Sequence, residues 1–396
     1  MNPIDELRAA RPAHLGDAPV DQHTRATELS YAMAQARPAR SARRRRGIAR
    51  PMWGLSLAGA AAAVTAVAVV ATGTGGTAPR APSGSQAAPT GDQAESTRQV
   101  QLSARAVLLA AAHRADRQRD ETGAYWHTTS VRRSLFKVEG ADYAVMDRER
   151  IESWTPSATG RKQEQRSRTQ TLGALPASPQ DEAAWKQAGS PAKIPVVVPG
   201  KRGAKLALST TPGAVQYGHS ALFQGDKVFW LGRNVTMKDL RGLPSEPGRL
   251  KAWLLRSYEG HGTESSSDPM SSDAWLFAVT VGLITDMPVT PQVRGAAFRM
   301  LADLETIKVI DDVTDAEGRT GTAVAIDEHV KAKAAGEDDG AILQNRLIFD
   351  EETGQALANE NVVVEPGGLQ ADLAPGTVWN SQTVLDIGWT DDKPAT

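Results

Sequence analysis

The chain has 396 residues, a formal net charge of −1 and no cysteine. The missing cysteines exclude disulfides, thiolate zinc sites, a catalytic cysteine and a lipidated N-terminal cysteine. Charge is unevenly distributed, because residues 1–51 carry ten Lys/Arg against five Asp/Glu, whereas residues 52–396 carry 35 against 41. A nucleic-acid-binding domain would have a basic surface, so the mildly acidic remainder argues against nucleic acid as a partner.

Residues 1–51 contain few large apolar side chains and cannot bury much core. A short helix is predicted over residues 21–36, where Leu29 and Met33 recur at helical spacing. Two interpretations stay open for this inner segment. It is either a mostly disordered tail, or a docking segment that folds on a cytoplasmic protein partner through residues 21–36.

Residues 52–72 organise the chain, because they form twenty-one consecutive residues without a charge. An α-helix needs about 20 apolar residues to cross roughly 30 Å of hydrocarbon. The arginines just before this span are typical of a segment that fixes topology by the positive-inside rule and contacts anionic headgroups of the lipid bilayer: Arg43, Arg44, Arg45, Arg46 and Arg50. We therefore predict a single-pass cell-membrane protein with a cytoplasmic N-terminus and an extracytoplasmic C-terminal domain.

A cleaved signal peptide is the alternative to a retained signal-anchor. Signal peptides have an apolar core of about 7–15 residues near the N-terminus, whereas this core is longer and begins only at residue 52. A retained anchor is favoured, and cleavage after the small residues at 73–78 stays open. Residues 73–98 are rich in Gly, Pro, Ser, Thr and Ala and predict a flexible stalk.

Residues 99–391 form the predicted outer domain, with a short tail over 392–396. A helix is predicted from Ser96 to about Gln118. Runs rich in β-branched and aromatic residues, separated by turn signals, then predict strands over 124–138, 143–155, 161–172, 193–208 and 221–231.

Helices interrupt the strands in the middle of this domain. Helix starts are predicted at Ser178-Pro179, at Ser245 with Pro247 two residues later, and at Thr290-Pro291. Residues 275–284 form an apolar run too short to cross a bilayer and are predicted as a core helix. Strands are then predicted over 306–313, 318–326, 341–349, 355–364 and 377–389. The order of strands, helices and strands predicts an α+β fold with an antiparallel sheet packed on helices.

No enzymatic or metal signature is found. Gly218-His219-Ser220-Ala221-Leu222 lacks the final glycine of a nucleophile elbow, and the seven histidines form no HExxH pattern. The acidic clusters at 311–317 and 337–339 fail the EF-hand spacing, and hairpin turns or a solvated loop explain them more simply. We predict a protein that is not an enzyme and has neither a cofactor nor a metal.

Tryptophans are the remaining candidate site residues. Five of them fall on predicted strands or helices: Trp126, Trp154, Trp230, Trp253 and Trp275. Either they fill the core, or some of them line an apolar groove between the sheet and the helices. The second interpretation predicts an apolar envelope ligand.

Short motifs along the chain carry a resemblance: Tyr125-Trp126, Glu152-Ser153-Trp154, Leu243-Pro244, Pro291-Gln292-Val293-Arg294-Gly295-Ala296-Ala297, Gly318-Arg319-Thr320-Gly321, Phe349-Asp350, Thr353-Gly354 and Leu357. Their order resembles a family of uncharacterised actinobacterial single-pass membrane proteins often encoded beside extracytoplasmic-function sigma factors. The motifs mark turns and the ends of helices and strands, and they are not catalytic signatures. The outer domain also resembles the open half-barrel of lipoprotein-carrier proteins and of the periplasmic sensor that modulates an anti-sigma factor.

The topology and this resemblance imply a non-enzymatic regulatory or sensory protein, linked to sigma-factor regulation. The inner segment lacks the His…Cys-x-x-Cys pattern of zinc anti-sigma domains, which argues against direct inhibition. The alternative is a tethered extracytoplasmic binding module for an envelope lipid, glycolipid or peptide. A hydrolase would rest on Ser220 alone.

Overall fold

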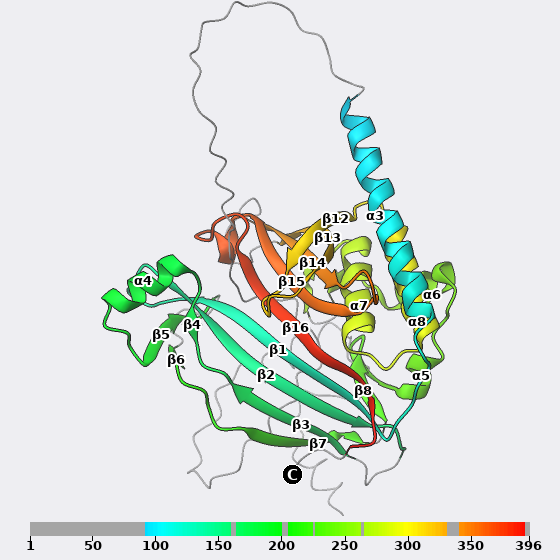
Figure 1. Ribbon diagram of the computed structural model, residues 1–396, viewed down its shortest axis with the longest axis horizontal. Coiled ribbons are helices and arrows are strands. Elements are labelled where there is room, and N and C mark those ends of the chain that lie inside the picture. The colour runs from blue at the N-terminus through cyan, green and yellow to red at the C-terminus, as the bar shows by residue number, and fades with distance from the viewer. Residues whose placement is uncertain are drawn as a thin grey trace, which may run out of the picture. The chain divides into compact units, whose positions relative to one another are not determined.

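The computed structural model describes residues 92–159, 164–199, 205–224, 226–262, 265–330 and 340–392 (Figure 1). The predicted inner segment, the span at residues 52–72 and the stalk as far as residue 91 lie outside the described residues. Among the helices that are described, none is both long enough and apolar enough to cross a membrane. The chain divides into two units, Met1–Gly47 and Ile48–Thr396, and every described residue belongs to the second.

A ten-stranded antiparallel sheet forms one layer of this unit, in the order β12-β13-β14-β15-β16-β1-β2-β3-β7, with β4 paired to β2. Its last strand along the chain, β16, pairs with its first, β1, in the middle of the sheet. The strands are β1 (Tyr125–Lys137), β2 (Ala144–Pro156), β3 (Glu164–Thr171), β4 (Leu175–Pro176), β7 (Gln216–Gln224), β12 (Lys308–Thr314), β13 (Thr320–Val330), β14 (Ala341–Phe349), β15 (Ala356–Glu365) and β16 (Val378–Thr390).

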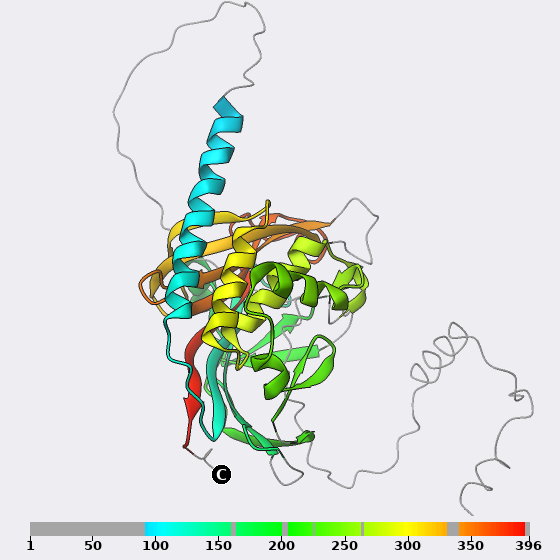
Figure 2. The same cartoon turned by 90° about the vertical axis from the view of Figure 1, so that its right-hand side faces the viewer.

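Helices form the second layer, and in Figures 1 and 2 they lie on one side of the strands β12–β15. They are α3 (Asp92–Asp116), α5 (Met237–Arg241), α6 (Pro247–Leu254), α7 (Ser272–Thr285) and α8 (Pro291–Ala302), with the 3-10 turn η1 (Leu255–Ser257). Helix α4 (Pro179–Gln187) lies apart from them beside β4, and a second 3-10 turn, η2 (Gly368–Gln370), contacts β14. Three small hairpins complete the unit: β5 (Lys193–Val197) with β6 (Lys205–Ser209), β8 (Lys227–Trp230) with β9 (Arg233–Thr236), and β10 (His261–Gly262) with β11 (Ser265–Pro269).

Side-chain caps start the two central helices. The Ser271 hydroxyl accepts a hydrogen bond from the backbone N–H of Ala274 at the start of α7. Thr290 does the same for Val293 at the start of α8, where Pro291 occupies the first helical turn. Helix α7 is apolar all round and is buried over most of its length, which explains its central place in the helical layer.

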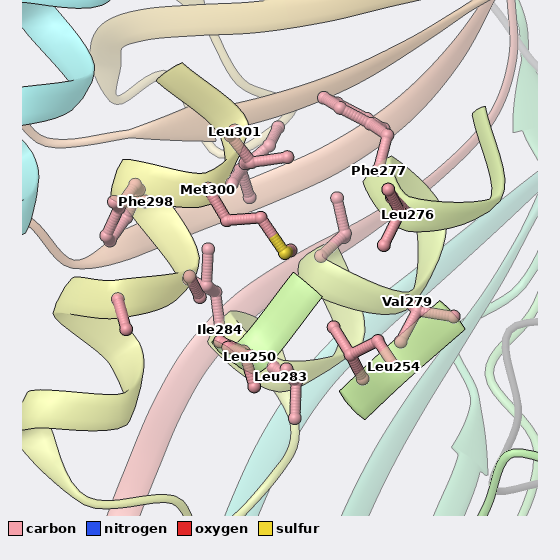
Figure 3. Close-up of a cluster of buried hydrophobic side chains, with 14 of the residues drawn as sticks. Leu250, Leu254, Leu276, Phe277, Val279, Leu283, Ile284, Phe298, Met300 and Leu301 are labelled. Atoms are coloured by element: carbon pink, nitrogen blue, oxygen red, sulfur yellow. The ribbon is translucent and has the colours of Figure 1, made fainter. Parts of the chain in front are cut away.

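The main core lies between these helices and the strands β13–β15 (Figure 3). Phe298 of α8 meets Phe349 of β14 with ring centroids 5.5 Å apart. Gly295 lets α3 approach α8 closely, because a Cβ at this position would overlap the Asp116 carboxylate and lie 3.0 Å from the carbonyl oxygen of Ala112. The predicted α+β fold with an antiparallel sheet packed on helices is confirmed.

Two predicted strands have different boundaries in the structure. Within the predicted strand over 193–208, Lys193–Val197 and Lys205–Ser209 are instead two strands, β5 and β6, that pair with each other. The segment predicted as one strand over 221–231 is divided, because β7 ends at Gln224 and β8 then pairs with β9. Leu231 and Gly232 make this second turn with positive φ values of 51° and 70°, the geometry of a type I′ hairpin. Leucine rarely takes this conformation, so the turn was missed.

Candidate functional site

The side of the sheet that faces the helices is identified by Trp126 on β1. Its indole Nε1 donates a hydrogen bond of 2.7 Å to the carbonyl oxygen of Asp286, the residue that follows α7. Side chains alternate between the two sides of a strand, and directly paired residues share a side. The strand register therefore shows which residues of the neighbouring strands lie on the same, helix-facing side as Trp126.

The helix-facing side changes character across the sheet. Over β13–β15 it is apolar and presents Val324, Ile326, Leu347 and Phe349 to the helices. The register continues this side across β14, β15, β16, β1, β2 and β3. Many of the residues on it there have amide, hydroxyl or charged side chains. We call this second set the polar strip: Asn345, Asn359, Asn361, Asn380, Gln382, Arg132, Glu149, Asp147, Thr128, Ser153, Gln165 and Ser167.

Some members of the polar strip bond to one another. Asn361 Nδ2 donates to Asn380 Oδ1 at 2.6 Å, and Arg132 forms an ion pair with Glu149 on the neighbouring strand. Gln165 Nε2 donates to the Thr155 hydroxyl at 3.1 Å. These contacts order the side chains without satisfying all of them.

Four members of the strip keep a side-chain oxygen that is buried and has no hydrogen-bond partner: Asp147 Oδ1, Ser153 Oγ, Gln165 Oε1 and Asn359 Oδ1. A buried polar atom without a partner costs about 1–3 kcal/mol of folding free energy. Native proteins have few such atoms, and a group of them on one side of one sheet needs an explanation. Oxygens of this kind accept hydrogen bonds from hydroxyl and amide donors of a ligand or of water.

Asp286 lies where the polar strip meets the helices. Burial raises the pKa of its carboxyl group from 3.8 to about 6, although hydrogen bonds from Thr285 and Gln382 act in the opposite direction. Gln382 Nε2 donates to Asp286 Oδ1 at 3.3 Å. The residue therefore connects the C-terminal end of α7 to β1 through its backbone carbonyl and to β16 through its side chain.

A surface pocket of about 590 Å³, largely open to solvent, lies at the end of the helix-facing side where β1 begins and β16 ends, and we refer to it as the cavity. Trp389 forms one wall, and its ring meets Trp126 edge-on with centroids 5.3 Å apart. The Arg241 guanidinium lies 5.8 Å from the Trp389 ring centroid and pairs with Asp120 at 2.7 Å. Hydroxyls and charges complete the lining at Ser157, Thr159, Asp226 and Lys238. The cavity thus combines an aromatic wall with polar groups, as small-molecule sites do.

The structure separates the five tryptophans singled out from the sequence. Trp126 lies beside Trp389 near the cavity, while Trp154 is on the opposite side of the sheet, with its ring centroid 4.8 Å from that of His127. Trp230 and Trp253 stack on each other at 5.9 Å in the helical core, and Trp275 is buried against Tyr258. Of the five, Trp126 alone contributes to the site described here.

Sequence reasoning missed Trp389 and the polar strip. Trp389 becomes a neighbour of Trp126 because the last strand pairs with the first, and nothing in a single sequence shows that pairing. The alternating amides of β15 were a usable signal, since Asn359 and Asn361 share one side of a strand. The arginines at 43–46 and 50 lie outside the described residues.

The serine of the predicted but incomplete nucleophile motif lies within a strand. Ser220 is part of β7 and pairs with Gln165, whereas a nucleophile elbow needs a sharp strand-to-helix turn. Across the described parts of the chain, no three His, Asp or Glu residues come together as a metal site would require. The chemistry that the described geometry offers is hydrogen bonding and stacking.

Comparison with protein-family models, curated proteins and solved structures gives no match. The resemblance to sigma-factor-associated membrane proteins therefore stays a prediction, as does the likeness to lipoprotein carriers. The functional assignment rests on the polar strip and the neighbouring cavity.

Proposed function

We propose that this chain is a non-enzymatic, membrane-anchored sensory protein whose outer domain binds a polar ligand on the helix-facing side of its sheet. The observation that carries the proposal is the group of buried, unpartnered oxygens on the polar strip. A sheet that only had to be stable would place apolar side chains against its helices, as Val324, Leu347 and Phe349 do. Keeping acceptors there lowers stability, and ligand donors that bind them would recover it.

The ligand class follows from the groups available. The strip offers mainly acceptor oxygens and amides, and the cavity adds an aromatic wall and hydroxyls. A glycan or glycolipid headgroup with hydroxyl and acetamido groups supplies matching donors and an apolar sugar face for Trp389. An acyl chain would leave the same oxygens without partners. Among the expected lipid, glycolipid and peptide ligands, the geometry favours the glycan part of a glycolipid.

The sensory part of the proposal comes from the sequence. The uncharged span at residues 52–72 would anchor the outer domain, the sheet would form the half-barrel of the carrier type, and residues 21–36 would contact a cytoplasmic partner linked to a sigma factor. A pull-down with the full chain and with a variant lacking residues 21–36 tests this part. Recovery of a sigma-factor or polymerase component by the full chain alone is the expected result, and recovery of none contradicts it.

Ligand binding is tested with chitotriose as the glycan probe and palmitate as the acyl probe, on the full chain in phosphatidylcholine nanodiscs. Titration calorimetry should detect chitotriose binding. The double variant Ser153→Ala/Asn359→Leu should lower the affinity for chitotriose about tenfold, which corresponds to the loss of one to two hydrogen bonds. Ser381→Ala, a buried serine on the opposite side of the sheet, is the matched control. Binding of palmitate alone, or equal loss in the control, would contradict the proposal.

The alternative is a tethered binding module without signalling. In this alternative the ligand binds at the same polar strip and cavity, so the expected result of the ligand-binding experiment is the same. It differs in the pull-down, where neither form of the chain would retain a cytoplasmic protein.

A further inference from the structure

The side of β2 and β3 that faces away from the helices carries four arginines. The register pairs Glu152 with Arg168 and Trp154 with Arg166, so these residues share the outer side with Arg150 and Arg148 of β2. Neighbouring strands are about 4.8 Å apart, and alternate residues of one strand are about 6.8 Å apart. We call these four residues the arginine face.

Carboxylates balance only part of this charge. Arg150 and Arg168 both contact Glu152, at 3.0 and 3.1 Å, and so share one negative charge. Arg148 donates to the backbone carbonyls of Gly173 and Leu172, at 3.1 and 3.2 Å. Within the described part of the chain, Glu152 is the one carboxylate that forms an ion pair with these four guanidinium groups, while Glu317 and Asp147 act on Arg148 through their charge alone. Positive charge therefore remains in excess on this side of the sheet.

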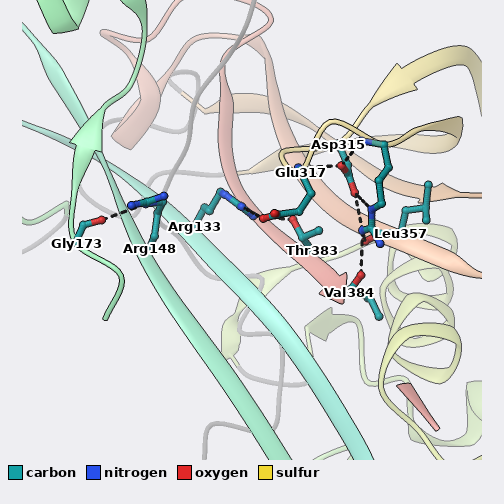
Figure 4. Close-up of polar contacts among 9 residues, drawn as sticks. Arg133, Arg148, Gly173, Asp315, Glu317, Leu357, Thr383 and Val384 are labelled. Carbon is teal, nitrogen blue, oxygen red and sulfur yellow. Dashed lines mark hydrogen bonds and ion pairs between the residues drawn. The ribbon is translucent and has the colours of Figure 1, made fainter. Parts of the chain in front are cut away.

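The neighbourhood of Arg148 shows the crowding of positive charge directly. Figure 4 shows its side chain directed toward Gly173, while the nearby Arg133 points toward Glu317 and Thr383. Glu317 forms an ion pair with Arg133, and its negative charge also acts to raise the pKa of Arg148. Burial, followed by the positive charge of Arg133, lowers the pKa of Arg148 from its ordinary value.

The arginine face is open to solvent at its centre. The side chains of Arg150 and Arg168 are 45% and 39% exposed. Tyr217 of β7 pairs with Arg168 and is 55% exposed, which extends the same open surface by one strand. A ligand can reach these groups without any rearrangement of the fold.

We infer that the arginine face is a second binding site, and that its occupant is a linear polyanion with repeated phosphate groups. Guanidinium groups bind phosphate oxygens through two parallel N–H donors, and groups spaced 5–7 Å apart can engage phosphates at intervals along one chain. The complementarity is local, because residues 52–396 as a whole carry more Asp/Glu than Lys/Arg. General attraction by the protein's net charge cannot supply it. A bilayer surface is less suitable, since the large exposed apolar side chains described on this side, Tyr217 and Leu175, lie on different strands at opposite ends of the arginine face.

The test uses the full chain in phosphatidylcholine nanodiscs and sodium polyphosphate as the probe. Inorganic phosphate, a single phosphate unit, is the comparison. Dye-labelled polyphosphate should bind, with an affinity that falls steeply as salt increases. Replacing Arg150, Arg166 and Arg168 by Glu should weaken binding at least tenfold and make the salt dependence shallower. Inorganic phosphate should bind far more weakly than the polymer.

The matched control changes Arg117, Arg119 and Arg249 to Glu, which alters the net charge equally at exposed positions away from the sheet. Unchanged polyphosphate binding in this control supports the inference. Three results overturn it: no binding by the wild-type chain, equal loss in the control, or tighter binding of phosphatidylglycerol vesicles than of polyphosphate with the same arginine dependence. Chitotriose binding by the Arg-to-Glu variant separates failure of this site from failure of the helix-facing site.

Discussion

The two halves of the helix-facing side are made by the same sheet and yet have opposite chemistry. Over β13–β15, side chains such as Leu347 and Phe349 are fully buried against α7 and α8. Over β16, β1, β2 and β3, buried positions such as Ser153 and Gln165 hold oxygens without partners. The first half contributes the apolar burial that stabilises the domain, and the second reduces stability. The comparison teaches that one side of one sheet combines an apolar region with a polar one, and that β14 and β15 contribute to both, with Leu347 in the first and Asn359 in the second.

The largest expected effect comes from breaking the apolar half. Phe349→Ala removes a ring that is fully buried against Phe298, and we expect the free energy of unfolding to fall by about 3–5 kcal/mol. Urea denaturation followed by tryptophan fluorescence measures it. Leu369→Ala, at a side chain 51% exposed, should change stability by less than about 0.5 kcal/mol. Equal effects in the two variants would show that the apolar half does not dominate stability.

The next prediction concerns the boundary between the halves. Because burial raises the pKa of Asp286 from 3.8 to about 6, the folded protein holds this proton more tightly than the unfolded chain. The contribution of Asp286 to stability is therefore complete below about pH 4 and is lost as the pH rises through 6. Asp286→Asn should be about 3 kcal/mol more stable than the wild type at pH 8 and equal to it below pH 4.

The measurement is denaturant unfolding of both proteins from pH 4 to pH 8. Glu360, whose pKa burial raises to about 7, titrates in the same direction but is present in both proteins, so its effect cancels in the difference. A difference that does not vary with pH would show that Asp286 is not the titrating group.

A helix-packing prediction sharpens the account of the apolar half. Gly295→Ala should destabilise the domain by about 1–3 kcal/mol, because the new methyl group meets the Asp116 carboxylate and the Ala112 carbonyl of α3. Gly282→Ala in α7 is the matched control, since no atom lies within 4 Å of its Cβ position. The control should gain up to about 1 kcal/mol from helix propensity. Thermal unfolding of the two variants gives the comparison, and a loss in both would contradict close α3–α8 packing as the cause.

The smallest effect is expected in the polar half. Ser153→Ala removes a hydroxyl that is buried and without a partner, so stability should stay the same or rise by about 1 kcal/mol. Differential scanning calorimetry of the ligand-free protein measures it. A clear loss of stability would mean that the hydroxyl does have a partner, and the contrast between the two halves would weaken.

Local sequence signals predicted most of the fold because they act over a few residues. The strand predicted over 341–349 coincides with β14, where turn residues mark the following boundary. The helix predicted from Thr290 begins at Pro291, where a cap and a proline act together. The α+β class followed from the order of these elements.

The site could not be predicted in the same way, because it depends on which strands are neighbours. Asn361 and Asn380 are paired across β15 and β16, and Trp126 and Trp389 across β1 and β16, at separations in sequence that no periodicity encodes. The tryptophan-lined groove was expected from residue type alone. Trp154 and Trp230 show why that is insufficient, since one lies on the outer side and the other in the helical core.

The pairing of β16 with β1 also determines how the sheet is completed during synthesis. Until Val378–Thr390 leaves the ribosome, β1 has one free edge and no strand connects the two halves of the described sheet. An unpaired edge strand invites association with other chains, and contacts this distant in sequence form slowly. A chain that stops before β16 would therefore lose the strand that joins the apolar half of the sheet to the polar half. The last strand acts as the final closure of the domain.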